Sequence, residues 1–273
     1  MRGKLFPKVG RTAAVSMVTL LCSFVFLNVF NYLPANADED MVVQLVAHRG
    51  YSGAYPENTL SAFAGAYACG AKTVEFDVRK TKDDELVIYH DETLQKINGE
   101  EDESTIADHT YEELLQYDAG EWYGREYRLE RIPTLDQTLS LLQSTNMRIF
   151  CELKDIGEDR NFASQVYNTF EKYGLLDKVI FLSFKYEYLQ DIKGINPDQP
   201  IMKLASFGKS NLPEKYPAEY YGINMKTMTP KTVAAIHAAG AKVYCYTPET
   251  KGQMLSLQRL GVDGVITDNV IYQ

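Results

Sequence analysis

Short apolar runs rich in β-branched residues alternate with longer amphipathic stretches along most of the chain, from residue 42 to residue 267. This alternation is typical of repeated βα units, which place parallel strands in one sheet and helices over its outer face. A chain of 273 residues with 45% hydrophobic content is long enough to bury one large core. We therefore expect a single α/β domain, a (β/α)8 barrel of the TIM type.

The pattern predicts nine strands for the eight positions of such a barrel. They are 42–47, 73–78, 86–89, 148–153, 178–183, 201–205, 222–225, 242–246 and 264–267. Either the last of these is a short strand outside the barrel, which we favour, or one of the weaker runs is a loop. Helices are predicted at 59–69, 135–143, 161–173, 231–239 and 252–260, and a glycine follows four of them as a helix terminator (Gly70, Gly174, Gly240 and Gly261).

The connections around the third predicted strand depart from the regular pattern. Only seven residues separate Val78 from Leu86, too few for a helical crossover, so the helix between the second and third strands should be missing. About forty residues then follow His90 before Ile132. Such an enlarged loop lies over the carboxyl ends of the strands, where barrels carry their functional residues. We interpret it as a lid or a substrate wall.

Residues 1–37 have the order of a signal peptide. Four basic residues precede 12–30, a run of nineteen mostly apolar residues without a charge, and Ala35-Asn36-Ala37 offers a cleavage site of small residues. Because such a run can also span a bilayer, an uncleaved membrane anchor at 12–30 is the alternative. Both readings predict an exported domain at 38–273, secreted or otherwise extracytoplasmic.

The charge of the exported part is strongly acidic. Removing the four basic residues of 1–37 changes the formal net charge from −9 to −13. A surface of this charge repels phosphate backbones, so a nucleic-acid partner is not expected. A small-molecule ligand is the simpler expectation, with membrane association only through the apolar run at 12–30.

Polar residues gather at the carboxyl ends of the first four predicted strands. They are His48 and Arg49, Glu75 and Asp77, His90, and Glu152 and Lys154. Because parallel strands of a barrel end at one rim, we expect these side chains to converge there. Glu75 and Asp77 are two residues apart and point to the same face of their strand, whereas Phe76 points oppositely into the packing.

The three carboxylates predict a cation site. If Glu75, Asp77 and Glu152 converge without an interior counter-charge, they repel one another and raise one another's pKa values. A divalent cation relieves this repulsion, and ligation by oxygen alone suits Mg²⁺ or Ca²⁺ better than Zn²⁺. In the alternative, Arg49 and Lys154 neutralise the carboxylates and no metal binds.

The two histidines at the rim suggest acid–base chemistry on a phosphate. Imidazoles on either side of a phosphorus atom can remove one proton and deliver another near neutral pH, a role open to His48 and His90. Arg49 offers a bidentate fork to phosphate oxygens and, with Lys154, can stabilise the added negative charge of a pentacoordinate state. His109, in a polar loop, and His237, in a predicted helix, are interpreted as non-catalytic.

Eight ordered motifs of the chain match one known family. They are His48-Arg49-Gly50, Tyr55-Pro56-Glu57-Asn58-Thr59, Glu75-Phe76-Asp77-Val78, Leu86-Val87-Ile88-Tyr89-His90-Asp91-Glu92-Thr93-Leu94, Asp118-Ala119-Gly120-Glu121-Trp122, Ile132-Pro133-Thr134-Leu135, Glu152-Leu153-Lys154 and Gly261-Val262-Asp263-Gly264-Val265-Ile266-Thr267-Asp268. On these motifs, 38–273 resembles the glycerophosphodiester phosphodiesterase family, a branch of the phosphatidylinositol phospholipase C-like barrels.

The resemblance implies hydrolysis of a glycerophosphodiester to glycerol 3-phosphate and an alcohol. It implies that His48 and His90 are the acid–base pair and that Glu75, Asp77 and Glu152 are the cation ligands. By analogy with the related phospholipases, His48 would deprotonate the glycerol 2-hydroxyl and His90 would protonate the leaving group, although the order of roles stays open. Glu57 would orient His48 or Arg49, or simply cap the following helix.

Two segments differ from the family pattern. The chain has Tyr246-Thr247-Pro248-Glu249 where the family usually has Trp-Thr-Val-Asn, and 124–131 lacks the Gly-Glu expected before Ile132. The family pattern therefore does not predict the substrate wall at the eighth strand. Lysophospholipids, inositol lipids or teichoic-acid-like polymers are alternative substrates. Aromatic residues that could line an acyl or alcohol site are Trp122, Tyr123, Tyr127, Tyr220, Tyr221 and Tyr246. A barrel that binds such a ligand without turnover is the remaining alternative.

Overall fold

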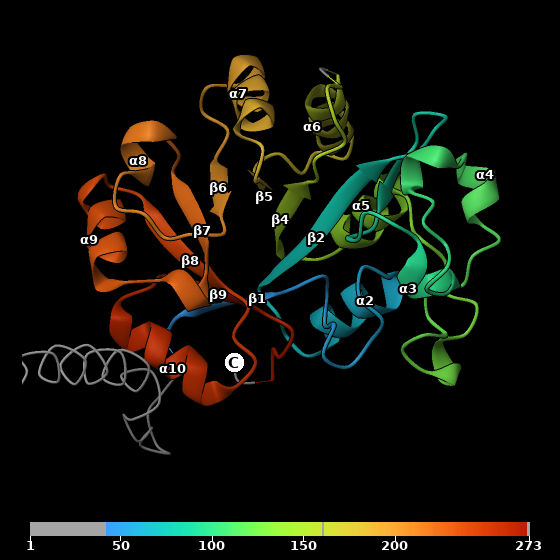
Figure 1. Ribbon diagram of the computed structural model, residues 1–273, viewed down its shortest axis with the longest axis horizontal. Helices are drawn as coiled ribbons and strands as arrows, with labels where there is room; N and C mark the ends of the chain where they lie inside the picture. The colour runs from blue at the N-terminus through green and yellow to red at the C-terminus, as the bar shows by residue number, and fades with distance from the viewer. Residues whose placement is uncertain (1–41, 160, 272–273) are drawn as a thin grey trace, which may run out of the picture. The chain divides into compact units, whose positions relative to one another are not determined.

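The computed structural model describes residues 42–159 and 161–271, which form a closed barrel of eight parallel strands (Figure 1). The barrel strands are β1 (Gln44–Ala47), β2 (Thr73–Lys80), β4 (Arg148–Leu153), β5 (Val179–Ser183), β6 (Ile201–Ala205), β7 (Tyr220–Asn224), β8 (Lys242–Tyr246) and β9 (Gly264–Thr267). Pairing of Ala47 with Val74 joins β1 to β2 and closes the ring. The expected single (β/α)8 barrel is confirmed.

The ninth strand lies elsewhere than predicted. β3 (Leu86–Ile88) pairs antiparallel with β2 and stands outside the ring, whereas β9 pairs in parallel with both β8 and β1. The expectation of an outer last strand is therefore wrong. The tight turn at 81–85 explains the difference, because a hairpin of this length can join only antiparallel strands. No helix separates β2 from β3, as predicted.

Helices follow or precede the barrel strands and lie around the outside of the sheet (Figure 1). They are α2 (Leu60–Ala68), α5 (Leu135–Gln143), α6 (Phe162–Lys172), α7 (Tyr186–Ile195), α8 (Leu212–Lys215), α9 (Pro230–Ala238) and α10 (Lys251–Leu260). Threonine hydroxyls at 59, 134, 229 and 250 accept backbone N–H groups of the first turns. The four glycines predicted to terminate helices all have positive φ, between 66° and 92°.

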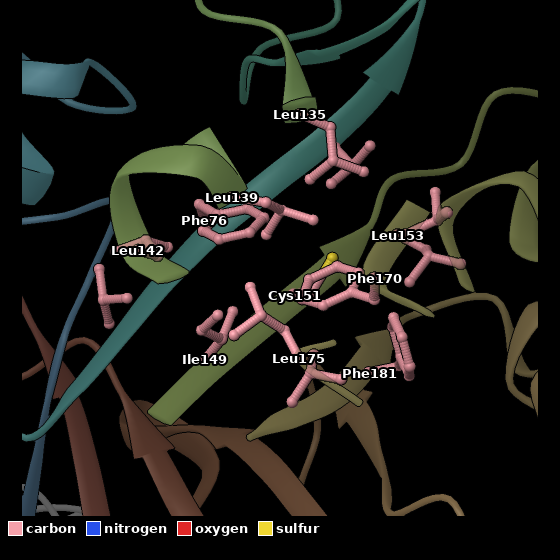
Figure 2. Close-up of a cluster of buried hydrophobic side chains, with 14 of the residues drawn as sticks. Phe76, Leu135, Leu139, Leu142, Ile149, Cys151, Leu153, Phe170, Leu175 and Phe181 are labelled. Atoms are coloured by element: carbon pink, nitrogen blue, oxygen red, sulfur yellow. The ribbon is translucent and has the colours of Figure 1, made fainter. Parts of the chain in front are cut away.

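Apolar side chains pack on both faces of the barrel sheet. Outside the strands, Phe76 of β2 packs in one core with side chains of α5, β4 and α6 (Figure 2). Inside the barrel, a second core contains Phe150 and Ile266. Cys151 joins the outer core and Glu152 returns to the inner side, because successive residues of a strand face opposite ways. The predicted outward position of Phe76 is confirmed.

The enlarged loop after β3 is a packed insertion, residues 89–134. It contains α3 (Gln95–Asn98), η1 (Ile106–Asp108), α4 (Tyr111–Leu114) and η2 (Arg125–Tyr127), and it lies on the β2 side of the barrel, at the right of Figure 1. Its own core is formed by Val87, Tyr89, Leu94, Ile106, Leu114, Ala119 and Ile132. This burial makes the insertion a structured part of the fold.

The predicted signal segment at 1–37, with its apolar run at 12–30, lies outside the described residues. Within 42–159 and 161–271, no helix combines the length and the apolarity that a bilayer span requires.

Candidate active site

His48 and a carboxylate meet at the junction of β1 and β9. His48 follows β1 directly, and its backbone N–H donates to Thr267 O of β9 at 3.0 Å. The neighbouring strand end supplies Asp268, whose Oδ1 lies 2.7 Å from His48 Nδ1 and also accepts a hydrogen bond from Ser52 Oγ at 2.8 Å. Burial raises the pKa of Asp268, but hydrogen bonds and the charge of His48 outweigh it and lower the pKa. We call His48 and Asp268 the His48 pair.

His90 reaches the same rim by a different path. Its strand β3 is antiparallel, so the expectation that it ends at the rim like a barrel strand is wrong. β2 continues beyond the level of Asp77 to Lys80, and β3 returns from there, with Tyr89 N–H donating to Asp77 O at 3.0 Å. His90 Nδ1 then lies 2.7 Å from Asp91 Oδ1. We call His90 and Asp91 the His90 pair.

Three carboxylates form an acidic cluster at this rim. Oxygen atoms of Glu75, Asp77 and Glu152 all lie within 4.8 Å of one another, and the three residues are at most 9% exposed. Burial and the charge of Asp77 raise the pKa of Glu152 to about 7 and that of Glu75 well above its usual range. The pKa of Asp77 is instead lowered, because the counter-charges of Arg49 and Lys154 outweigh burial.

Two cations contact the acidic cluster. Lys154 Nζ lies 2.9 Å from Glu152 Oε1 and 3.6 Å from Asp77 Oδ1, and Arg49 Nε lies 3.5 Å from Asp77 Oδ2. When all three carboxylates are ionised, two cations face three carboxylates, which leaves one negative charge in excess. The donor set is all oxygen and too crowded to carry this charge unassisted, so the residues present fit a Mg²⁺ or Ca²⁺ ion.

Arg49 presents a buried donor to the same region. Its Nε has no hydrogen-bond partner among the described residues, whereas its Nη1 donates to Glu57 Oε1 at 2.9 Å. Glu57 therefore contacts Arg49, and the cap of α2 is Thr59 instead. The turn is tight: Gly50 has a φ of 81°, and a Cβ there would lie 2.7 Å from Ala62. A buried, unbonded N–H in this position suits an anionic oxygen.

A cavity of about 140 Å³ joins these groups. Its polar lining residues are His48, Arg49, Glu75, His90, Glu152, Lys154 and Thr247, and its apolar ones are Leu182, Phe184, Leu204, Tyr246 and Ile266. A second cavity of about 580 Å³ shares Glu152, Lys154 and Phe184 with it and extends to the insertion at 105–107. The insertion thus lines a cavity beside the site, and its role as a lid or a substrate wall stays a prediction.

Of the aromatic residues predicted as a substrate wall, only Tyr246 lines the smaller cavity. Tyr221 is 1% exposed in a core outside the barrel, and Tyr220 packs against Tyr244. Phe184, directly after β5, was not predicted, although its place after a barrel strand was a usable signal. His109 and His237 line neither cavity and contact Ser104 and Asp263.

The fold and the site define a TIM-type barrel whose rim carries an acidic cluster, two cations and two carboxylate-bound histidines. Residues 48–271 match the model of the glycerophosphoryl diester phosphodiesterase family. The chain belongs to this family, which confirms the resemblance seen in its motifs and the enzyme class that it implied.

Relatives of this chain match it over most of their length. A glycerophosphodiester phosphodiesterase of Caldanaerobacter subterraneus subsp. tengcongensis is 32% identical over 84% of this chain and 95% of the relative. One of Bacillus altitudinis is 32% identical over 83% and 95%. Among solved structures, a phosphodiesterase of Oleispira antarctica in complex with the product sn-glycerol-3-phosphate is 31% identical, with a TM-score of 0.77 over 83% of this chain and 93% of that one.

Proposed function

We propose that the protein hydrolyses glycerophosphodiesters to glycerol 3-phosphate and an alcohol. The observation that carries the proposal is the shared cavity, which is lined by His48 and His90, by the cations Arg49 and Lys154, and by Glu75 and Glu152 of the acidic cluster. The product complex of the Oleispira antarctica relative supports glycerol 3-phosphate as the phosphate-bearing product.

Charge balance supports a phosphodiester as the ligand. With all three carboxylates ionised, as cation ligands would be, Arg49 and Lys154 leave the acidic cluster one negative charge in excess. A divalent cation held by Glu75, Asp77 and Glu152, together with the single negative charge of a phosphodiester, would bring the site to neutrality. Such a cation supplies Lewis-acid stabilisation of charge on the phosphoryl oxygens. Arg49, with its buried unbonded Nε, is the group in this chain best suited to hold a phosphate oxygen.

The two histidine pairs supply the proton transfers in this proposal. In each pair the carboxylate lies at Nδ1, which fixes a tautomer whose Nε2 is left to exchange a proton. His48 removes the proton of the glycerol 2-hydroxyl, whose oxygen bonds to phosphorus, and His90 delivers a proton to the leaving alkoxide. Water then opens the resulting cyclic phosphate to glycerol 3-phosphate, with the two histidines in exchanged roles. Each such transfer typically contributes about 10² to 10⁴-fold to the rate.

Lysophospholipids are a second candidate substrate, favoured by one feature of the cavity. Leu182, Leu204 and Tyr246 are apolar lining residues of the same cavity as the charged ones, and Phe184, which also lines it, is 44% exposed. An acyl chain would cover this surface, whereas a small polar alcohol would leave it in water.

We also propose that 1–37 exports the barrel, with cleavage after Ala37 or retention of 12–30 as a membrane anchor. Fractionation of expressing cells tests this, together with the N-terminal sequence of the exported protein. A full-length protein found only with the soluble contents of the cell would contradict it.

A substrate panel with and without chelator tests the activity. The purified protein is incubated with glycerophosphocholine, glycerophosphoethanolamine, glycerophosphoinositol, a lysophospholipid and a poly(glycerol phosphate), and the product that carries the phosphate is identified. Release of glycerol 3-phosphate that stops with chelator and returns with Ca²⁺ or Mg²⁺ is expected. Binding of these ligands without any product would favour the non-catalytic alternative.

A further inference from the structure

A lysine of the insertion lies between two carboxylates that hold the proposed machinery. Lys96, in α3, places Nζ 2.7 Å from Glu57 Oε1 and 3.5 Å from Asp91 Oδ2. The same Glu57 oxygen accepts from Arg49 Nη1 at 2.9 Å, and Asp91 Oδ1 lies 2.7 Å from His90 Nδ1. A continuous series of ion pairs therefore runs from the phosphate-binding candidate Arg49 to the proton-transfer candidate His90.

The insertion holds Lys96 in place from two sides. The ring of Trp122 lies under the ammonium, 4.8 Å from Nζ to the ring centroid, and Trp122 itself donates from Nε1 to Ala119 O at 2.9 Å. Leu94, next to the start of α3, is fully buried in the core of the insertion. The side chain of Lys96 is 29% exposed, so its ion pairs are less screened than those of a surface lysine.

The ammonium of Lys96 also reduces the repulsion between the carboxylates of Glu57 and Asp91. Ligand atoms of Glu57, His90 and Asp91 lie within 4.8 Å of one another, close enough for the two carboxylates to repel. Hydrogen bonding to His90 is the main cause that lowers the pKa of Asp91 to about 2, and the charge of Lys96 adds to it. Without Lys96, Asp91 and Glu57 would separate, and each would turn away from the group it holds.

We propose that Lys96 is a positioning residue for the phosphodiester hydrolysis described above, acting through Asp91 on His90 and through Glu57 on Arg49. The inference rests on the proposed function for its chemistry, and on the contacts of Lys96 for its geometry. It assigns to the insertion a part in the alignment of the site, in addition to its place beside the cavity.

Replacing the charge while keeping the stem tests the inference. Lys96→Met leaves an apolar side chain over Trp122 and should lower kcat/KM by about 10 to 100-fold, as misplacement of reacting groups does. Lys96→Arg should restore most of this loss, because a guanidinium can bond to both carboxylates. Lys172→Met is the matched control, since Lys172 is an exposed lysine paired with Asp136 of α5. Unchanged kcat/KM in Lys96→Met would overturn the inference.

A double-mutant cycle separates positioning from a general effect on folding. If Lys96 acts through Asp91, then Lys96→Met should cost several-fold less activity in an Asp91→Asn background than in the wild type. The same comparison with Glu57→Gln should show its effect mainly in KM, because Glu57 holds Arg49. Equal losses in all backgrounds would show a purely structural role and overturn the inference.

A crystal structure of Lys96→Met distinguishes failure of this inference from failure of the proposed function. If the wild-type protein hydrolyses no substrate of the panel, the proposed function fails, and the geometry can still be tested. Asp91 Oδ1 is expected to lie beyond hydrogen-bond distance of His90 Nδ1 in the variant. An unchanged contact between Asp91 and His90 would overturn the inference whatever the activity.

Discussion

The two histidine pairs occupy one rim but depend on different parts of the molecule. His48 and Asp268 are 220 residues apart in sequence, and the parallel pairing of β1 with β9 brings them together. His90 and Asp91 are adjacent in sequence, and an antiparallel strand and a packed insertion carry them to the rim. Closure of the barrel therefore aligns the His48 pair, whereas packing of the insertion aligns the His90 pair.

A change of leaving group should distinguish the roles of the two histidines most clearly. On glycerophosphocholine, His48→Ala and His90→Ala should each lower kcat/KM by about 10² to 10⁴-fold. On the p-nitrophenyl ester of glycerol phosphate, whose leaving group needs no proton, His90→Ala should lose about 10-fold or less and His48→Ala should keep its full loss. Steady-state kinetics on both substrates measures this.

His237→Ala serves as the control for these variants, because His237 lines neither cavity and its ring lies 2.9 Å from Asp263 Oδ2. If the p-nitrophenyl ester restores the activity of His48→Ala instead of that of His90→Ala, the two histidines have the opposite roles. Rescue of neither would contradict proton delivery to the leaving group.

Core substitutions test whether the two pairs can be separated by unfolding. Phe76→Ala removes a ring from the outer barrel core and should cost about 3–5 kcal/mol of unfolding free energy, whereas Leu94→Ala in the insertion should cost about 2–5 kcal/mol. If the insertion opens by itself, Leu94→Ala should lose activity at temperatures below the main calorimetric transition. Coincident loss of activity and structure in Leu94→Ala would show that insertion and barrel unfold as one unit.

Substitutions around Asp268 sharpen the description of the His48 pair. Asp268→Asn weakens the bond that orients His48 and should lower kcat by about 10 to 100-fold. Ser52→Ala removes one of the hydrogen bonds to Asp268 but leaves the carboxylate at His48 Nδ1, so a loss of only a few-fold is expected. A larger loss in Ser52→Ala than in Asp268→Asn would contradict this order.

The acidic cluster lines the same cavity as both histidines through Glu75 and Glu152, and its protonation should affect the pH dependence of stability. The folded metal-free protein keeps Glu152 protonated up to about pH 7, whereas the unfolded chain releases this proton near its ordinary pKa of 4.5. The folded state thus binds more protons in this window, and stability falls as pH rises through it.

A cation must displace the proton of Glu152 before it can use that carboxylate, so added Ca²⁺ or Mg²⁺ should raise Tm by a few degrees more at pH 8 than at pH 5. Differential scanning fluorimetry at both pH values measures the difference. Glu152→Gln should remove it, and an equal shift at both pH values in the wild type would argue against a cation at this cluster.

Much of the fold could be predicted because its signals are local. Alternating apolar runs gave the eight barrel strands within a few residues, and glycines marked four helix ends. The place of β3 and β9 could not be predicted in this way, since both are short apolar runs and only their pairing partners distinguish them. α7 was also not predicted, although its segment follows β5 directly.

For the site, the sequence by itself determined the residue types and their grouping: two histidines, three carboxylates, Arg49 and Lys154 at or next to strand ends. Side chains two residues apart on a strand share a face by covalent geometry alone, so Glu75 and Asp77 were certain to point together. Only the tertiary structure decided the partners Asp268 and Lys96, because both contacts join segments distant in sequence. Such contacts arise from barrel closure and from packing of the insertion, and no local pattern records them.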